Sequence, residues 1–479
     1  RLPVAGEPVK GPGDRSLVED TVEEGWGWVG LFDQADAGAL SVLGLHALQH
    51  RGQESAGIVT HDEGQFIAER HQGLVGDAFG RGSAAAKNLK GRFAIGHNRS
   101  STAGGSPASN LQPIFADLAG CGLAIAHNGN PTNAHTLRQE LVGQGAIFQS
   151  TSDTETIVHL TARSPKLRIV EKLIDALCQV EGAYSLVALT SKKVIGVRDP
   201  YGVRPLVMGN LDGATIFASE TCALDIIGAE YVRDVKPGEM VVVDKDGIHS
   251  HFPFKPQQHR FCVFEYIYFA RPDSTLEGRN VYEARKNIGA VLAQEAPVAA
   301  DMVIPVPDSG VPAALGFANE AGILFGLGII RKPYVGRTFI DPSESIRHLG
   351  VRLKHNPNRA MLKGKKVVLV DDSIVRGTTS KKIVAMVRDA VFAGAGGGFH
   401  AFKWRLAMAM AKDQGNPQVP VALIHRVFAR EFPDRAALGR ATGWSADTIG
   451  EIDAYAGADA VYSFPTRRET LSGLPPAVG

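Results

Sequence analysis

The sequence predicts two domains of mixed secondary structure, a layered α+β domain followed by an α/β domain with a mainly parallel sheet. Its length of 479 residues exceeds what one ordinary hydrophobic core holds. Strand-like segments recur between about residues 26 and 250 with few βαβ alternations, and strand–helix alternation begins near residue 260. We therefore expect a flexible leader, two domains and a tail at residues 1–25, 26–255, 260–465 and 466–479.

The expected elements follow from hydrophobic patterns in chain order. In the first domain, helices are predicted near 35–49 and 154–163. Apolar runs predict strands at 93–96, 122–126, 184–189, 194–197 and 240–243. Pro253 and Pro256 indicate a linker. The second domain then continues with a strand at 302–306, a helix near 311–321 and a strand at 367–370.

Composition argues against several classes of function. Lys plus Arg is 51 and Asp plus Glu is 50, so no strong charge attracts nucleic acid or a membrane surface. The longest apolar runs are shorter than a membrane span, and no secretory leader is visible. The four cysteines lack paired spacing, which favours a reducing cytoplasm over a disulfide scaffold or a zinc site. They are Cys121, Cys178, Cys222 and Cys262.

The segment 367–380 carries the strongest chemical signal. Four apolar residues predict a buried strand, and the carboxylates Asp371 and Asp372 follow at its end. A turn rich in glycine and hydroxyl groups then opens a helix; its residues include Ser373, Arg376, Gly377, Thr378, Thr379 and Ser380. Such a turn offers backbone N–H groups to a phosphate, while carboxylates suit sugar hydroxyls or a Mg²⁺ ion on a pyrophosphate. The segment predicts a site for a phosphorylated, diol-bearing sugar; the alternative is an ordinary capped turn.

Four short polar motifs lie between the predicted strands of the first half, at 49–54, 96–102, 126–130 and 152–155. Taken singly, each has a structural explanation. His50 and His127 can be core histidines, and Asn128-Gly129 can be a hairpin turn.

Taken together, the motifs predict a pocket for a zwitterion with an amide side chain. Arg99 can bind an α-carboxylate with its forked guanidinium, and Asp153 can bind an α-ammonium group. The side chain of Asn128 and the N–H of Gly129 can hold an oxyanion.

Segment 367–380 closely resembles the phosphoribosyl pyrophosphate (PRPP) signature of type I phosphoribosyltransferases. The polar motifs of the first half resemble the glutaminase domain of class II amidotransferases, which have an N-terminal nucleophile. From about Gly25 to Ala390 the combination resembles the amidophosphoribosyltransferase family. The resemblance implies a four-layer αββα sandwich, then a type I phosphoribosyltransferase fold, in a homo-oligomer that is a dimer or tetramer.

The resemblance also implies a two-step reaction. Glutamine is hydrolysed in the first domain, and the ammonia displaces pyrophosphate from C1 of PRPP to give phosphoribosylamine, in the first step of de novo purine synthesis. By the family pattern, Ser309, Asp371 and Asp372 lie at a Mg²⁺ site, and Arg337 and Lys354 belong to a loop that closes over PRPP. Purine nucleotides are expected as feedback ligands.

The chain departs from the family pattern at the nucleophile. Trp26 stands where the family has cysteine, and an indole has no thiolate or comparable nucleophile. By the resemblance, the α-amine of the nucleophile is also the base, and residues 1–25 would cap it. Ser100 replaces a usual tyrosine beside Arg99. We therefore expect the glutaminase half to be inactive and the reaction to depend on ammonia.

Two further departures concern the second half. After Asp389 we recognise neither the family's strand nor its Ser-Ser-Pro-Pro turn, which leaves nucleotide feedback open. Cys262 matches one ligand position of the iron–sulfur cluster that some members carry, but a lone thiol cannot hold a cluster. Mg²⁺ is therefore the expected cofactor, and an iron–sulfur cluster is not expected.

Three hypotheses remain open at this stage. The first is an amidophosphoribosyltransferase with an intact PRPP half and an inactive glutamine half. The second is a catalytically inactive PRPP- or nucleotide-binding regulator or partner subunit, which Trp26 and the altered segment 391–450 favour. The third is that both features are sequence errors and the parent protein is an ordinary enzyme.

Overall fold

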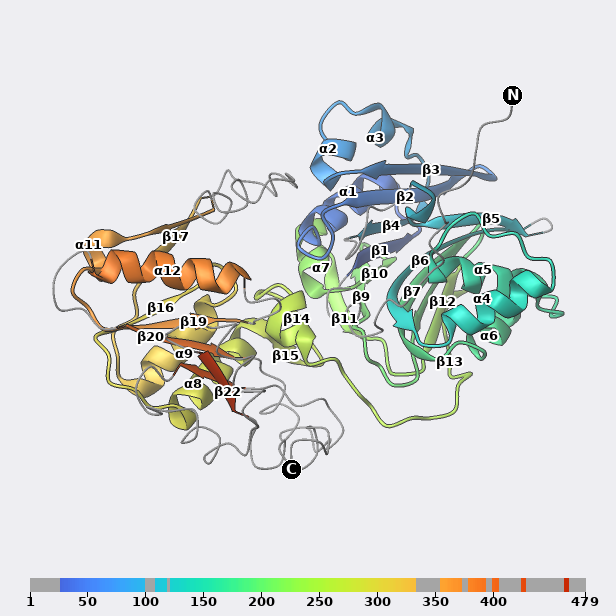
Figure 1. Ribbon diagram of the computed structural model, residues 1–479. Coiled ribbons are helices and arrows are strands. Elements are labelled where there is room, and N and C mark those ends of the chain that lie inside the picture. Colours follow the sequence, from blue (N-terminus) through green and yellow to red (C-terminus); the bar gives the residue numbers. More distant parts are fainter. Residues whose placement is uncertain are drawn as a thin grey trace, which may run out of the picture. The chain divides into compact units, whose positions relative to one another are not determined.

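A computed structural model describes residues 26–99, 108–118, 121–332, 354–372, 378–392, 399–404, 424–427 and 461–464. The chain divides into two compact units, Arg1–Gln257 and Gln258–Gly479, and each is described by itself (Figure 1). The predicted leader at 1–25 and the tail at 466–479 lie outside the described residues.

The first unit contains two antiparallel sheets among its described residues. In spatial order, the first sheet consists of β11 (Glu230–Asp234), β9 (Val207–Leu211), β10 (Ala214–Ala218), β1 (Gly27–Phe32), β4 (Phe93–Arg99), β2 (Ser55–Asp62) and β3 (Gln65–Gln72). The second consists of β13 (Gly247–His251), β12 (Met240–Asp244), β8 (Val194–Arg198), β7 (Gly182–Thr190), β6 (Cys121–Pro131) and β5 (Ile114–Leu118).

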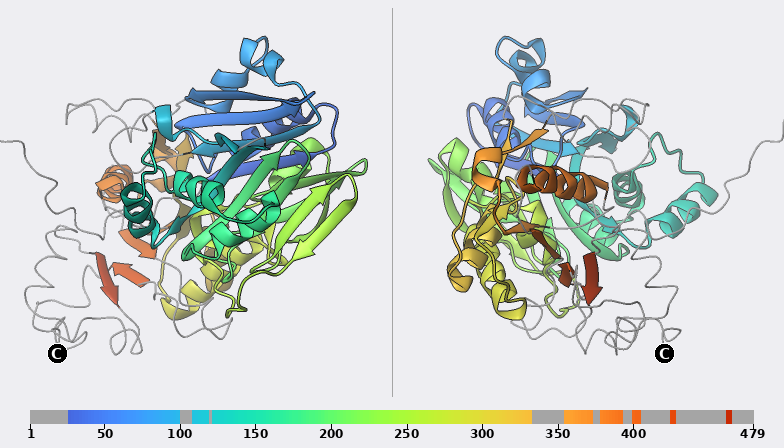
Figure 2. Two further views of the ribbon diagram at one scale, coloured as in Figure 1. Left: turned by 90° about the vertical axis from the view of Figure 1, so that its right-hand side faces the viewer. Right: turned by 60° about the vertical axis from the view of Figure 1, so that its left-hand side comes forward.

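Helices cover the outer faces of the two sheets (Figures 1 and 2). The first sheet carries α1 (Ala37–Ala47) and α7 (Thr221–Ile227), and the second carries α4 (Ala134–Gly143), α5 (Asp153–Arg163) and α6 (Ile169–Leu177). The short helices α2 (Val75–Phe79) and α3 (Ala84–Asn88) follow β3.

Two apolar clusters hold these layers together. Ile95, Val187 and Phe217 belong to the cluster between the sheets. Leu173 and Leu186 belong to the cluster between the second sheet and its helices. The predicted four-layer αββα arrangement is confirmed.

The second unit is built on a sheet in the order β16 (Met302–Pro305), β19 (Val367–Asp371), β20 (Phe399–Trp404), β21 (Ile424–Val427) and β22 (Val461–Phe464). The pairs β16–β19 and β19–β20 are parallel, and the pairs that involve β21 are antiparallel. Its helices are α8 (Val281–Glu295), α9 (Val311–Ala321), α11 (Arg359–Leu362) and α12 (Thr378–Phe392). Short elements are η2 (Glu265–Phe269), β14 (Thr275–Leu276), β15 (Arg279–Asn280), β17 (Ile329–Arg331) and β18 (His355–Pro357).

Most elements lie where the sequence predicts them, and two interpretations need correction. The sequence after Asp389 shows no recognisable counterpart of the family's strand, yet β20 follows there and pairs with β19. Asn128-Gly129 is not a hairpin turn, because both residues lie inside β6. Within the described residues, no helix combines the length and apolar character needed to cross a membrane.

Candidate functional site

The polar motifs of the first half converge around Trp26, which directly precedes β1. Gly27 and Asn98 are register partners in the β1–β4 pair, and the Gly27 N–H donates to Asn98 Oδ1 at 3.0 Å. The amide of Asn98 in turn donates to the carbonyls of Leu45 and Leu48 at 3.1 and 2.9 Å, at the end of α1. A fully buried asparagine thus fixes the start of β1 through backbone atoms.

The indole of Trp26 fills the space at this point and is only 3% exposed. Its ring centroid lies 5.6 Å from that of His97 and 6.3 Å from that of His127, and both contacts are edge-to-face. The guanidinium carbon of Arg99 lies 5.1 Å from the ring centroid, which is a cation–π distance. Arg99, the predicted carboxylate ligand, therefore contacts the indole.

The predicted oxyanion residues lie on the neighbouring sheet. Asn128 is fully buried, and its Nδ2 donates to the Trp26 carbonyl oxygen at 2.7 Å. Its Oδ1 has no hydrogen-bond partner among the described residues. Gly129 lies opposite Tyr184 of β7, where a Cβ atom would come within 2.2 Å of the Ala183 carbonyl oxygen. Only glycine fits this close approach of two strands.

Asp153 begins α5, where Ser152 caps the helix by accepting a hydrogen bond from the Thr154 N–H. A carboxylate is favourable at this end of a helix. One oxygen of Asp153 lies 3.7 Å from Nδ1 of His127, and Thr154 Oγ1 lies 3.3 Å from the same nitrogen. Asp153 therefore reaches the cluster around Trp26 through His127.

Burial keeps both histidines of the cluster neutral. It lowers the pKa of His97 to about 3, with further lowering by Arg99. His97 Nε2 donates to the carbonyl oxygen of His127 at 3.2 Å. Burial also lowers the pKa of His127, although Asp153 acts in the opposite direction. The cluster is thus an aromatic, largely uncharged packing unit, with Arg99 and Asp153 at its margin.

The second candidate site lies at the end of two parallel strands. Pro305 of β16 is the register partner of Val370 of β19, so both strands end at the same edge of the sheet. Asp371 is 7% exposed, Asp372 is half-buried, and the Asp372 N–H donates to Asp371 Oδ1 at 3.1 Å. Ser309, half-buried, lies in the turn between β16 and α9. Both carboxylates and the turn with Ser309 therefore lie at the carboxyl ends of neighbouring parallel strands. Ligands of α/β sheets bind at this position.

The structure describes some of the other predicted PRPP residues and not others. Thr378, Thr379 and Ser380 form the first turn of α12. Lys354 immediately precedes β18, and its carbonyl oxygen accepts from the Lys332 N–H at 2.8 Å. Ser373, Arg376, Gly377 and Arg337 lie outside the described residues.

The donors at this edge suit a metal ion that arrives with its substrate. Asp371 and Asp372 supply carboxylate oxygens and Ser309 a hydroxyl, the hard ligands that Mg²⁺ prefers. Among the described residues, no group of three or more His, Cys, Asp or Glu side chains is placed to hold a metal. These donors fit Mg²⁺ that keeps waters and phosphate oxygens as ligands better than an all-protein cage.

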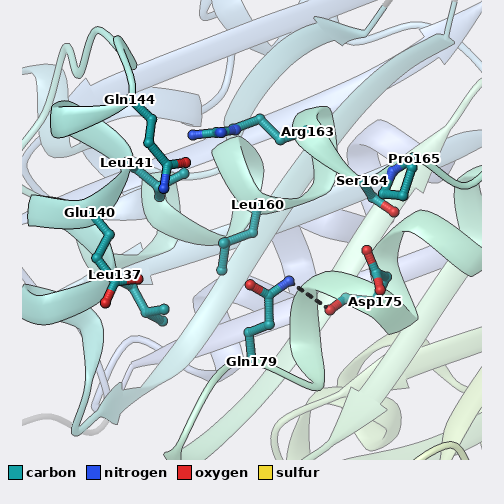
Figure 3. A pocket seen from close by; sticks show the side chains of 10 residues that line it. All are labelled: Leu137, Glu140, Leu141, Gln144, Leu160, Arg163, Ser164, Pro165, Asp175 and Gln179. Atoms are coloured by element: carbon teal, nitrogen blue, oxygen red, sulfur yellow. Dashed lines mark hydrogen bonds between the residues drawn. The ribbon is translucent and has the colours of Figure 1, made fainter.

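A hollow of about 220 Å³ lies elsewhere on the first unit, between α4, α5 and α6 (Figure 3). Leu141 and Leu160 lie among its lining residues, together with Glu140, Arg163 and Asp175. None of the predicted site residues lines it. The hollow is therefore separate from both predicted sites and carries no evidence about either.

Comparison with known proteins places the chain in a family. Residues 97–225 match a family model described as a glutamine amidotransferase domain. The amidophosphoribosyltransferase of Rhizobium etli is 58% identical over 384 residues, which cover 79% of this chain and 77% of that protein. The chain belongs to the amidophosphoribosyltransferase family. The amidophosphoribosyltransferase of Bacillus subtilis is 46% identical over 370 residues, and the aligned region covers 77% of each protein.

Solved structures agree with this membership of the amidophosphoribosyltransferase family. One, named as the allosteric regulatory enzyme of purine biosynthesis, has a TM-score of 0.74 and 45% identity, covering 78% of this chain and 80% of that chain. The glutamine PRPP amidotransferase of B. subtilis, complexed with ADP and GMP, has a TM-score of 0.73 and 44% identity with the same coverage. The predicted family, the two-part fold and the transferase class are confirmed.

The structure also brings in residues that the sequence did not single out. Asn98 fixes the start of β1, and His97 packs against Trp26. Both residues lie in the polar motif at 96–102, which the sequence indicated as part of a site without giving either residue a role. At the second site, Arg331 forms an ion pair with Asp308, next to Ser309. No sequence pattern indicated that pair, because the two residues lie on separate elements.

Proposed function

We propose that the chain is an ammonia-dependent amidophosphoribosyltransferase, which forms 5-phosphoribosylamine from PRPP and does not hydrolyse glutamine. The observation that carries this proposal is Trp26. Its indole is 3% exposed and occupies the position of the family's nucleophilic cysteine, while the Asp371–Asp372 pair is retained at the end of β19.

Two physical arguments support an inactive glutamine half. An indole carbon or N–H cannot attack a carboxamide as a thiolate does. The guanidinium of Arg99, which would otherwise bind the α-carboxylate of glutamine, also lies over the face of the indole. A glutamine molecule would have to displace a buried aromatic side chain before it could bind.

The second half has the groups that the remaining reaction requires. The nitrogen lone pair of ammonia forms a bond to C1 of PRPP, the bond from C1 to the pyrophosphate oxygen breaks, and a proton leaves the nitrogen. Asp371 and Asp372 would hold the ribose hydroxyls, and the first turn of α12 would hold the 5-phosphate. Mg²⁺ bound with Ser309 and the carboxylates would offset charge on the leaving pyrophosphate.

Regulation and assembly extend the same proposal. The B. subtilis relative was solved with ADP and GMP, which supports purine nucleotides as feedback ligands of this chain. Homo-oligomers, dimers or tetramers, are expected from the family resemblance, and a cytoplasmic location is expected from composition. Most of segment 391–450, where nucleotide contacts are in question, lies outside the described residues.

The test is pyrophosphate release from PRPP and Mg²⁺ with ammonium, with glutamine and with no nitrogen donor. Release with ammonium alone is the expected result. Release with glutamine would overturn the inactive glutamine half.

If no donor leads to pyrophosphate release, the proposed transferase activity is contradicted. That result would favour the alternative, a PRPP- or nucleotide-binding regulator or partner subunit. Titration calorimetry with PRPP and Mg²⁺ would then measure binding without turnover.

A further inference from the structure

We propose that the nitrogen substrate of this chain is neutral ammonia that reaches it through solution, released by a separate protein that hydrolyses a C–N bond. The inference rests on the proposed ammonia-dependent function and names the source of its nitrogen. The groups around Trp26 carry it, because they decide whether the first unit can release ammonia itself.

The thiols of the first unit are not placed to replace the missing nucleophile. Cys121 begins β6, about 23 Å along that strand from Asn128, which contacts the Trp26 carbonyl, at about 3.3 Å per residue. Cys178 caps α6, in the helix layer on the outer face of the second sheet. Cys222 is 3% exposed, and its Sγ lies 3.7 Å from a buried carboxylate oxygen, which disfavours the thiolate.

A hydroxyl, an imidazole and a carboxylate do meet beside Trp26, but their arrangement does not activate the hydroxyl. Thr154 Oγ1 lies 3.3 Å from Nδ1 of His127, and an oxygen of Asp153 lies 3.7 Å from the same ring nitrogen. A hydrolytic triad has its hydroxyl and its carboxylate on opposite nitrogens, so that the carboxylate orients the ring that takes the proton. Nε2 of His127 has no hydrogen-bond partner among the described residues.

Burial argues against this hydroxyl as well. Thr154 and His127 are both 0% exposed, so an amide substrate has no direct access to them. Burial also lowers the pKa of His127, which makes the imidazole a weak base. Within the described part of the first unit, neither the thiols nor this hydroxyl therefore provides a route from an amide to ammonia.

The chemistry at C1 of PRPP then defines what another protein has to supply. The new bond needs a nitrogen lone pair, which neutral ammonia has and the ammonium ion lacks. Hydrolysis of a C–N bond provides ammonia: water adds to the carbon, the C–N bond breaks, and the nitrogen leaves with a proton. In a sequence of reactions, an ammonia-releasing hydrolysis therefore precedes the step proposed for this chain.

The first experiment follows pyrophosphate release by the full chain with PRPP, Mg²⁺ and glutamine, with and without an added, unrelated glutaminase. Release is expected only when the glutaminase is present. Glutamate dehydrogenase with 2-oxoglutarate and NADPH, which consumes free ammonia, should suppress that release. If the glutaminase forms glutamate and no pyrophosphate appears, supply through solution is overturned.

The second measurement identifies the reacting species from KM for total ammonium at pH 7 and pH 8. The ammonium ion, like a lysine side chain, is almost fully protonated at both values, so its neutral fraction rises about 10-fold over this interval. KM for total ammonium should therefore fall about 10-fold. A KM that does not fall would mean that the chain takes up the ion, against the inference.

Thr154→Val is the matched variant, because it removes the hydroxyl nearest to His127 and keeps the branched shape of the side chain. It should leave ammonium-driven release unchanged and form no glutamate from glutamine, like wild type. Glutamate that wild type forms and Thr154→Val does not would identify an internal nucleophile and overturn the inference.

The ammonium reaction separates this inference from the proposed function. If wild type releases no pyrophosphate with ammonium at either pH, the proposed function fails and the inference fails with it. If ammonium supports release but ammonia from the glutaminase does not, only the inference fails.

Discussion

The surroundings of Trp26 and the strand ends at Asp371 differ in how they tolerate substitution. Around Trp26, Asn128 donates to the carbonyl of residue 26 and Asn98 accepts from the N–H of residue 27. Any amino acid at position 26 supplies that carbonyl, so the scaffold persists when the side chain changes. At the end of β19, by contrast, the proposed reaction uses the side chains of Asp371 and Asp372 themselves. A fold can therefore keep the shape of a site after its reactive group is lost.

Electrostatics separates the two regions further. Burial keeps His97 and His127 neutral around the indole. The second region has adjacent carboxylates, one of which is half-buried. The first region therefore behaves as a hydrophobic core, and the second presents carboxylate oxygens that a cation or the hydroxyl groups of a ligand could use.

The largest effect should come from the carboxylates of the second region. Asp371→Asn combined with Asp372→Asn should reduce ammonium-driven pyrophosphate release at least about 1,000-fold, because both proposed ligands of the ribose and Mg²⁺ lose their charge. Steady-state kinetics checks this. Asp389→Asn, an exposed position near the end of α12, is the matched control and should leave the rate unchanged. If the double variant keeps its activity, the side chains at the end of β19 are no more essential to the ammonium reaction than the residue at position 26.

Trp26 should matter for stability and not for the ammonium reaction. Trp26→Ala should lower the unfolding free energy by about 3 kcal/mol, because a buried aromatic side chain leaves a cavity. Urea denaturation measures this, and Leu167→Ala, at a residue that is 94% exposed, is the control with almost no change. A large drop in ammonium-driven rate at full stability would show that the first region still takes part in the reaction.

The neutral histidines should make the first unit sensitive to acid. The pKa of His97 is about 3 in the folded chain, against an ordinary value of 6.5 for histidine, so the unfolded chain binds more protons between these values. The stabilisation is complete above pH 6.5 and is lost as pH falls; at pH 5 the loss is about 2 kcal/mol for this one histidine.

The measurement is urea denaturation at pH 7 and pH 5 of wild type and His97→Gln. Burial raises the pKa of Asp199 to about 6, which opposes the histidine below that pH, but it acts in both proteins and cancels in the difference. Equal pH dependence of the two proteins would contradict a neutral His97 in the fold.

The smallest effect should come from Arg99. Arg99→Gln removes the contact between guanidinium and indole and the hydrogen bond from Arg99 Nη1 to the Asn110 carbonyl at 3.1 Å, and should cost about 1 kcal/mol. Arg92→Gln, in an exposed pair with Asp33, is the control. Thermal unfolding compares the two. Neither change should alter the ammonium-driven rate, because Arg99 has no glutamine to bind in this account.

Several parts of the fold could be predicted because local patterns decide them. The apolar run that became β19 is followed by two acids that no buried strand interior would accept, so both the strand and its end were predictable. Helix α6 is not among the predicted elements, although Ile169, Val170, Leu173 and Leu177 have the spacing of an amphipathic helix.

Other features depend on contacts between distant segments. Asn128-Gly129 has the sequence of a hairpin turn, but pairing with β7 places it inside a strand. The burial of the Trp26 indole against Arg99 requires residues from β4 and β6 to meet, which no local pattern indicates. The pairing of Arg331 with Asp308 likewise arises only when β17 packs near the end of β16.

The central claim is that the glutamine half is inactive because residue 26 does not supply an N-terminal nucleophile. The most direct measurement is glutamate formation from glutamine by the wild-type chain and by a chain that starts at residue 26 with Trp26→Cys, with Trp26→Ser as the matched control. The account predicts no glutamate from wild type, glutamate from the cysteine variant and much less from the serine variant. Glutamate formed by the wild-type chain would contradict the account.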